Sequence, residues 1–249
     1  RILVHAPEDL NKLKDLGLLE NTSIFPHGIL DFHNHTSSNH NTFSKRLFVN
    51  DKDDNDFKVI STFGYCLPNK GFSELIKAIS ILREKSFIVH LRLFCAIHSS
   101  ILSQEYHLEL VDLIDKLSIS DQIILDTSFY TDQETLVKLS ESDLIVFPYQ
   151  NSNESSSASV RHGIATGIPV LVTPISIFDD VSRAVDKLPG TTEFALAQGI
   201  EDWYSDKFKR TENESINFHR KLWRDQHRFS KLGLRLQGMI RAIEHDYWT

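Results

Sequence analysis

The sequence predicts an α/β protein in which a parallel sheet carries helices on both faces and a helical C-terminal tail follows. Two observations support this fold class. Short apolar segments alternate with segments of helical periodicity through the middle of the chain, at the spacing of strands and crossover helices. Beyond Gly199 the apolar residues keep a helical spacing to the end of the chain.

Length and composition agree with this class. The chain has 249 residues, of which 41% are hydrophobic and 24% charged, both ordinary for a globular protein. No apolar segment approaches the roughly 18 residues of a membrane span. The net charge is -7, whereas nucleic-acid-binding domains usually carry a basic surplus, so no nucleic acid partner is expected. The only cysteines, Cys66 and Cys95, are too few for a disulfide framework and fit a reducing compartment.

The chain divides into four parts in this prediction. Residues 1–29 have the pattern of a strand, a helix with Pro7 near its start, and a second strand that ends near Gly28. Residues 30–56 lack periodicity, end in a charged segment and are predicted to be a linker. Residues 57–199 form the main domain, and residues 200–249 form helices that pack back on it.

The main domain is predicted to be Rossmann-like, with each strand followed by a helix. Thr131 and Glu134 have the spacing of a capping box, which marks the start of the third helix. The expected strands cover residues 57–63, 87–95, 122–125, 143–147 and 169–173, and the expected helices cover residues 72–82, 101–117, 131–139 and 155–165.

Ligands of an open parallel sheet bind beyond the carboxyl ends of the strands, and two loops there carry suitable residues. The first follows the first strand of the main domain. In it Gly64 lets a ligand approach the backbone, and Lys70 places a cation beside the start of the next helix, where a phosphate can bind. The alternative interpretation is an ordinary turn ahead of a helix.

The second loop, residues 147–158, leads directly into a helix and is rich in serine. Small residues at a helix start leave amide groups accessible to an anion, and the carboxylate of Glu154 can accept hydrogen bonds from sugar hydroxyls. The alternative is a serine N-cap on a plain loop. A lysine and an amide-rich helix start at the ends of strands in one sheet favour a diphosphate ligand.

Several common site motifs are absent. The sequence contains no P-loop, no dinucleotide-binding glycine motif, no hydrolase nucleophile elbow and no zincin motif. His33, His35 and His40 lie close together in the predicted linker, but no cysteine supports them, so surface histidines are favoured over a metal site.

Residues Ile60 to Pro174 resemble the C-terminal, donor-binding lobe of GT-B-fold group 1 retaining glycosyltransferases. The resemblance rests on Gly64, Lys70 and Gly71 ahead of a helix with Leu75-Ile76-Lys77-Ala78, on the strand Ser142 to Pro148, and on the run from Glu154 through Gly167 to Pro169-Val170. Residues 1–28 resemble the last segment of the N-terminal lobe of that family. The resemblance therefore implies an acceptor-binding N-terminal lobe upstream of Arg1.

The resemblance also implies roles for individual residues. Lys70 and Glu154 are the expected catalytic residues: Lys70 neutralises the donor phosphates, and Glu154 binds hydroxyls of the transferred sugar. Amides at the helix start hold the distal phosphate, and Phe129 or Tyr130 offers an aromatic face to the base. The full set expected to bind the nucleotide sugar is Gly64, Tyr65, Lys70, Phe129, Tyr130, Glu154, Ser156, Ser157, Ala158 and His162.

The sequence departs from the family pattern at two positions. Tyr65 occupies the place of a phosphate-binding arginine, and His162 occupies the place of a second glutamate that binds ribose hydroxyls. A neutral imidazole can still hydrogen-bond a hydroxyl. Arg161 either replaces the lost cation or is turned away by the helical geometry.

By this resemblance the expected function is sugar transfer from a nucleoside diphosphate sugar to an acceptor hydroxyl with retention, of the hexosyltransferase type. No metal and no cofactor are required, because Lys70 and the helix start take the role of a divalent cation. The acceptor is expected to be a glycan or a lipid-linked glycan in bacterial surface polysaccharide synthesis. The alternatives are a noncatalytic nucleotide-sugar-binding scaffold lobe and an epimerase or phosphorylase of the same fold.

The expected location is the cytoplasm, at the inner face of the membrane. Basic residues on the C-terminal helices are compatible with peripheral membrane contact there, although a solvated basic face is the simpler interpretation. Because the acceptor lobe is expected upstream of Arg1, this fragment is expected to be inactive alone.

Overall fold

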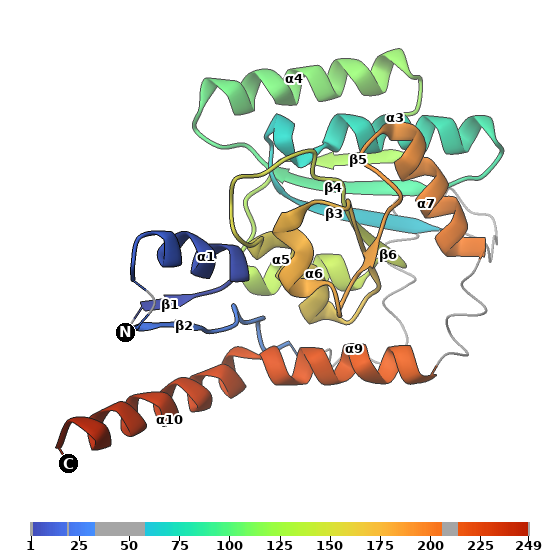
Figure 1. Ribbon diagram of the computed structural model, residues 1–249. Helices are drawn as coiled ribbons and strands as arrows, with labels where there is room; N and C mark the ends of the chain where they lie inside the picture. The colour runs from blue at the N-terminus through green and yellow to red at the C-terminus, as the bar shows by residue number, and fades with distance from the viewer. Residues whose placement is uncertain (1, 19, 33–57, 206–213, 249) are drawn as a thin grey trace.

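The central feature of the computed structural model is a six-stranded, fully parallel sheet with the order β5-β4-β3-β6-β7-β8 (Figure 1). The structure describes residues 2–18, 20–32, 58–205 and 214–248. The strands are β3 (Val59–Tyr65), β4 (His90–Ala96), β5 (Ile123–Asp126), β6 (Leu144–Phe147), β7 (Val170–Val172) and β8 (Asp186–Lys187). The Rossmann-like prediction is therefore confirmed.

Helices cover both faces of this sheet, as Figure 1 shows. Helices α3 (Phe72–Glu84), α4 (Ile101–Lys116) and α7 (Glu193–Ser205) lie on one face, and α5 (Asp132–Ser140) and α6 (Ala158–Thr166) lie on the other. Strand β6 illustrates the cause. Leu144 and Val146 belong to the core of the first face, whereas Ile145 and Phe147 belong to the core of the second. Alternate side chains point to opposite faces, and a strand apolar at every position needs cover on both.

Three local predictions need correction. Helix α6 begins at Ala158 with Ser157 as its N-cap, three residues after the predicted start at Ser155. Strand β8 was not predicted, because two residues carry no periodicity. Helix α7 begins at Glu193 and packs on α3, whereas the sequence predicted helical structure only beyond Gly199. The limits of the domains themselves stay a prediction, and residues 33–56 of the predicted linker lie outside the described residues.

The N-terminal residues form a small unit beside the main sheet. Strands β1 (Ile2–Val4) and β2 (Thr22–Ile24) pair in parallel, and helix α1 (Pro7–Asp15) connects them. After β2, the segment of residues 25–32 lies in space beside the C-terminal helices α9 (Glu214–His227) and α10 (Phe229–Trp248). Where these two helices meet, the amide of Ile29 donates to His227, and the amide of Phe229 donates to Ile29. Residues 25–32 are thereby held beside the α9–α10 junction.

The C-terminal helices do not pack through the whole apolar stripe predicted for them. Phe218, Leu222 and Ile240 are exposed, whereas the buried contacts come from Trp223 and Leu232. Trp223 joins the core of the α5/α6 face, so α9 packs on the main domain through one large aromatic ring. Within the described residues, no helix combines the length and the apolar composition that crossing a membrane requires.

Candidate functional site

The two predicted ligand loops lie against each other at the carboxyl ends of β3 and β6. The amide of Gln150 donates to the carbonyl of Asn69 over 2.9 Å, which joins the loops directly. Gly71 has a left-handed backbone, with φ of 72°, and a Cβ there would lie 1.9 Å from the carbonyl oxygen of Pro148. Only glycine permits both this conformation and this approach. The short helical turn η1 (Pro68–Lys70) and the loop after β6 therefore form one unit.

Lys70 is the central cation of this unit. Its side chain is 8% exposed, and its Nζ lies 4.0 Å from the centroid of the Tyr149 ring. No carboxylate in the described part of the chain forms an ion pair with it. A charged amine loses hydration on burial and needs compensation. The aromatic face supplies part of that compensation, and a bound anion would supply the rest.

Tyr149 links Lys70 to the start of helix α6. Its ring is fully buried, and its hydroxyl lies 3.3 Å from the hydroxyl of Ser157. Ser157 accepts a hydrogen bond from the amide of Val160 and is the N-cap of the helix. This buried contact explains why the third serine of the run caps the helix. Tyr149 was not among the predicted site residues, because the order of residues in the sequence does not reveal which aromatic ring lies under Lys70.

The first amides of α6 are available for an anion. Ala158 and Ser159 open the helix, and no hydrogen bond engages their amides within the described residues. The partial positive charge of a helix N-terminus adds to that of these groups. Of the three residues predicted to present amides, Ala158 lies in the helix, whereas Ser156 and Ser157 belong to its approach.

Gly64 lies beside this helix start. A Cβ at Gly64 would meet Phe72 and Ser159 only at 3.7 Å, so the protein's own packing does not require glycine there.

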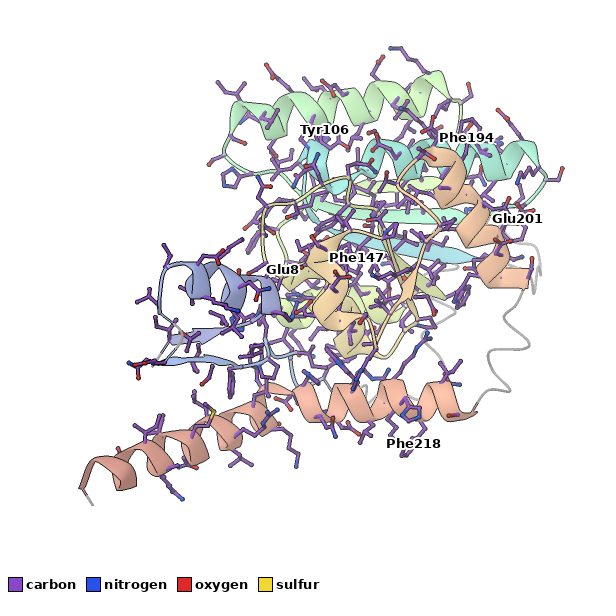
Figure 2. All side chains as sticks on the ribbon, viewed as in Figure 1. Glu8, Tyr106, Phe147, Phe194, Glu201 and Phe218 are labelled. Atoms are coloured by element: carbon purple, nitrogen blue, oxygen red, sulfur yellow. The ribbon has the colours of Figure 1, made fainter. Side chains whose placement is uncertain are left out.

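Glu154 is separated from Lys70 in the contacts of the structure. It is exposed on the loop before α6 and borders a polar cavity of about 430 Å³ that faces helix α1. From α1 the cavity receives Glu8, Asp9 and Lys12, and Figure 2 labels Glu8 at the end of α1 nearest the main domain. Among the described residues, Glu154 and Lys70, the two expected catalytic residues, have no direct hydrogen bond to each other.

The loop after β5 fixes one of its two candidate aromatic residues and leaves the other exposed. The Tyr130 hydroxyl donates to Asp126 over 2.6 Å, and the Tyr130 ring packs edge-on against Phe94. Burial disfavours the charged form of Asp126, but the hydrogen bonds from Tyr130 and Ser128 outweigh it, so the pKa of this carboxyl lies below its usual range. Phe129 is 77% exposed and is the aromatic face that a base could reach.

The two departures from the family pattern have different surroundings. Tyr65 is 46% exposed at the end of β3 and packs edge-on against His98. His162 is held on both ring nitrogens: Nε2 lies 2.9 Å from Asp132, and Nδ1 lies 3.1 Å from the carbonyl of Ala158. Its imidazole also packs on Phe63, with 5.2 Å between the ring centroids.

Arg161 does not replace the cation that is absent at Tyr65. Its guanidinium is buried, forms an ion pair with Asp180 and donates to the carbonyl of Ser157. Helical geometry turns the side chain away from the strand ends, which was one of the two alternatives for this residue. Its role is structural, because it ties the N-cap of α6 to the segment after β7.

His27 is a further residue near the helix start. Its Nδ1 lies 3.2 Å from the hydroxyl of Ser156, and its ring stacks on His5. Burial, followed by the charges of Arg161 and His5, lowers the pKa of His27 to about 4, so the imidazole is neutral at neutral pH. His27 was not among the predicted site residues, although Pro26-His27-Gly28 was predicted to end the second strand of residues 1–29.

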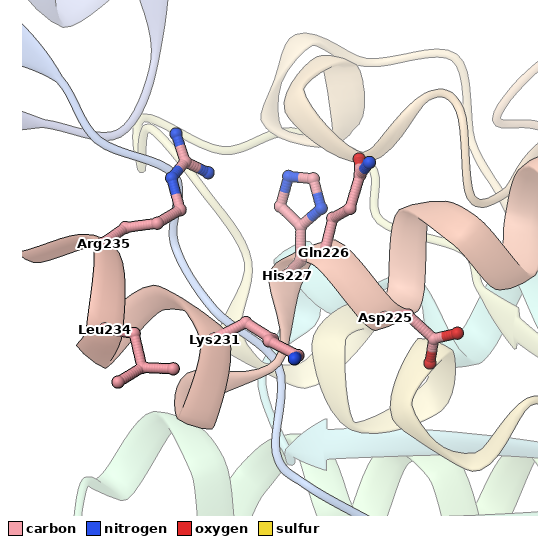
Figure 3. A pocket seen from close by; sticks show the side chains of 6 residues that line it. All are labelled: Asp225, Gln226, His227, Lys231, Leu234 and Arg235. Atoms are coloured by element: carbon pink, nitrogen blue, oxygen red, sulfur yellow. The ribbon is translucent and has the colours of Figure 1, made fainter.

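A separate cavity lies at the junction of α9 and α10 and contains none of the predicted site residues. Figure 3 shows the side chains around it, which come from the end of α9 and the start of α10. Its volume is about 640 Å³, and its lining includes Lys231, Leu234 and Arg235. No group of three histidine, cysteine or acidic residues that could hold a metal ion occurs in the part of the chain that the structure describes. His33, His35 and His40 lie outside that part.

Comparisons with known proteins identify relatives of this fold. Residues 44–221 match the family model described as glycosyl transferases group 1. Among solved structures, a glycosyltransferase from Rickettsia africae has a TM-score of 0.76 at 16% identity, and it is matched over 98% of this chain and 63% of its own. Alr3699/HepE from Anabaena, in complex with UDP and glucose, has a TM-score of 0.76 at 14% identity over 96% of this chain and 62% of its own.

A third solved structure, the sucrose-phosphate synthase of Thermosynechococcus elongatus, has a TM-score of 0.71 at 15% identity, over 98% of this chain and 58% of its own. This chain thus spans about three fifths of the length of each of these proteins. No curated protein sequence matches it.

Proposed function

Because the chain belongs to the group 1 glycosyltransferases, we propose that it is the donor-binding lobe of an enzyme that transfers a sugar from a nucleoside diphosphate sugar. The observation that carries the proposal is Lys70, a buried cation with no carboxylate partner among the described residues, which Tyr149 and Ser157 connect to the open start of α6. A diphosphate is an anion that both groups can bind at once.

In the proposed reaction the bond between the anomeric carbon and the diphosphate oxygen breaks, and its electron pair leaves with the diphosphate. The acceptor oxygen forms the new bond to the anomeric carbon, and its proton passes to an oxygen of the departing diphosphate. Negative charge grows on the leaving diphosphate, so groups that bind it more strongly as it departs accelerate the reaction. Lys70 and the amides of Ala158 and Ser159 would have this role, and no metal is needed for it.

Glu154 would contact the transferred sugar. Its carboxylate borders the polar cavity that faces α1, and a cavity of about 430 Å³ has room for a sugar ring with its hydroxyl groups. Retention at the anomeric carbon, the type of sugar and this role of Glu154 are parts of the proposal. UDP is the first nucleotide to test, because the Anabaena neighbour holds UDP and glucose.

The acceptor belongs to the same proposal. We propose a glycan or a lipid-linked glycan, at the cytoplasmic side of a bacterial membrane. Exposed Leu234 on α10, beside basic Lys231 and Arg235, would suit such a location.

Nucleotide binding to the 249-residue chain tests the donor site. We expect isothermal titration with UDP, GDP, ADP and dTDP to find at least one ligand. The substitution Lys70→Met should lower the affinity for that ligand by about 10- to 100-fold, since a charge-assisted hydrogen bond contributes roughly 1.5–3 kcal/mol. The matched control is Lys116→Met on α4, where the lysine is exposed and pairs only with Asp112. Absence of binding by all four nucleotides would refute the donor site.

A second candidate function is a noncatalytic nucleotide-sugar-binding lobe. Tyr65 favours it, because the aromatic side chain leaves one phosphate-binding cation fewer than the family pattern has. The two candidates differ in turnover. If the chain is part of an enzyme, Glu154→Ala in the full-length protein should abolish sugar transfer and leave nucleotide affinity unchanged. A scaffold lobe should show no transfer before or after the substitution.

A further inference from the structure

The surroundings of His162 determine which hydrogen bonds its ring can make. Nε2 faces a carboxylate oxygen of Asp132 at 2.9 Å, and Nδ1 faces the carbonyl oxygen of Ala158 at 3.1 Å. The carbonyl oxygen and the oxygens of an ionised carboxylate carry no proton, so they can accept a hydrogen bond but cannot donate one. Each ring nitrogen therefore faces an acceptor oxygen of the protein, whichever tautomer the ring adopts. This leaves His162 without a free ring nitrogen for a ligand hydroxyl, contrary to the expectation from the sequence.

Asp132 has a carboxylate oxygen that can accept a hydrogen bond from a ligand, whereas both ring nitrogens of His162 are already engaged. It is the first residue of α5, and its side chain is 71% exposed although one oxygen is bound to His162. No hydrogen bond from the described residues reaches its second oxygen. Packing of Phe63 on the imidazole fixes the ring, and the ring in turn fixes the carboxylate. Asp132 thus offers an oriented, accessible acceptor.

The pair borders a cavity of about 160 Å³ between the start of α5 and the first turns of α6. Ala158 and Arg161 of α6 contribute to its lining, and His27 and Gly28 enclose it from the opposite side. Through Ala158 this cavity adjoins the helix start with its open amides. The loop of residues 126–130, where Phe129 is exposed, precedes Asp132 in the chain.

The covalent order of a nucleotide decides what would lie in this region. In a nucleoside diphosphate the ribose connects the base to the phosphates. If the diphosphate binds at Lys70 and α6, and the base packs on Phe129, then the ribose diol must lie between them. Asp132 is two residues after Tyr130 in the chain and lines one cavity with Ala158 at the start of α6, so its carboxylate is available to a ribose bound between the two. Carboxylates bind ribose hydroxyls in dinucleotide-binding sheets.

We propose that Asp132 is the ribose-binding carboxylate of this protein and that His162 is its positioning residue. The inference rests on the proposed function and adds a residue to it. Position 162 has a histidine where the family pattern has a glutamate. In this proposal Asp132 of the neighbouring helix α5 provides the carboxylate, and its hydrogen bond to His162 holds it in place. The predicted ligand feature is a ribonucleotide with a free 2′-hydroxyl.

The experiment compares UDP with 2′-deoxy-UDP by isothermal titration. The unmodified chain should prefer UDP by about tenfold or more, because loss of the hydroxyl leaves the carboxylate without its partner. The substitution Asp132→Ala should reduce the preference to about twofold, mainly by weakening UDP. In that background, His162→Glu should restore the preference by returning a carboxylate to α6. The control is Asp112→Ala, an exposed aspartate on α4.

The outcomes separate the two levels of the proposal. An unchanged preference for UDP in Asp132→Ala, with the fold intact by circular dichroism, would overturn the role of Asp132 and leave the donor site standing. Absence of binding by UDP, GDP, ADP and dTDP alike to the unmodified chain would overturn the proposed function and this inference with it. If His162→Glu fails to restore the preference for UDP in the Asp132→Ala background, a carboxylate at position 162 cannot take the role of Asp132, and that part of the proposal is refuted.

Discussion

The two faces of the sheet differ in chemistry as well as in the helices that cover them. The face under α3, α4 and α7 is packed almost entirely with aliphatic side chains. The face under α5 and α6 is richer in aromatic rings and contains two nearly buried ion pairs, Arg161 with Asp180 and Arg92 with Glu141. Every polar contact to the start of α6 described above lies on this second face.

This difference separates stability from binding. Apolar attraction is not directional, so the first face can serve as a foundation. Buried ion pairs contribute little net stability, but removal of one partner is strongly destabilising. On the second face, Arg161 joins the N-cap of α6 to Asp180. The three following predictions test this division, in order of decreasing effect on stability.

The largest effect is expected from Arg161→Met on the second face. The change leaves the carboxylate of Asp180, one oxygen of which is already buried without a partner, in an apolar surrounding. We expect a loss of about 3–5 kcal/mol in the free energy of unfolding, measured by urea denaturation. The double variant Arg161→Met/Asp180→Leu should recover much of it. A loss below roughly 1 kcal/mol in the single variant would contradict this account.

Leu75→Ala should have the next largest effect, on the first face. Leu75 is fully buried in the apolar core, so truncation removes contacts and leaves a cavity. The free energy of unfolding should fall by about 2–5 kcal/mol, with UDP affinity unchanged in the folded fraction. The matched control is Leu108→Ala on the exposed side of α4. A selective loss of UDP affinity in Leu75→Ala would show that the two faces are not independent.

The smallest effect on stability is expected from the caps of α4 and α6. Ser157→Ala and Ser100→Ala each remove an N-cap hydroxyl and should each cost about 0.5–2 kcal/mol. Only Ser157 also contacts Tyr149 below Lys70, so only Ser157→Ala should weaken UDP, by about three- to tenfold. Equal UDP affinities in the two variants would count against a role of the α6 start in binding.

Sequence patterns predicted most of the sheet, because each strand and helix carries its own periodicity. They also marked the two loops that meet at the carboxyl ends of β3 and β6, since glycine, lysine and serine are local signals of such loops. What they missed depends on contacts between distant residues. The ring under Lys70 belongs to Tyr149, and the partner of His162 is Asp132, 30 residues away. The start of α6 was misplaced for the same reason, because the hydroxyl of Tyr149 contacts only one of three consecutive serines.

The close approach of Gly71 to Pro148 constrains how this site can change. Two loops that meet backbone to backbone move as one part, so the span between Lys70 and the α6 amides is set before any ligand arrives. New ligand preferences would then arise by exchanging side chains around a fixed frame, and not by lengthening either loop. An insertion in one loop would have to be matched in the other, which makes this pair of loops a poor place for gradual variation.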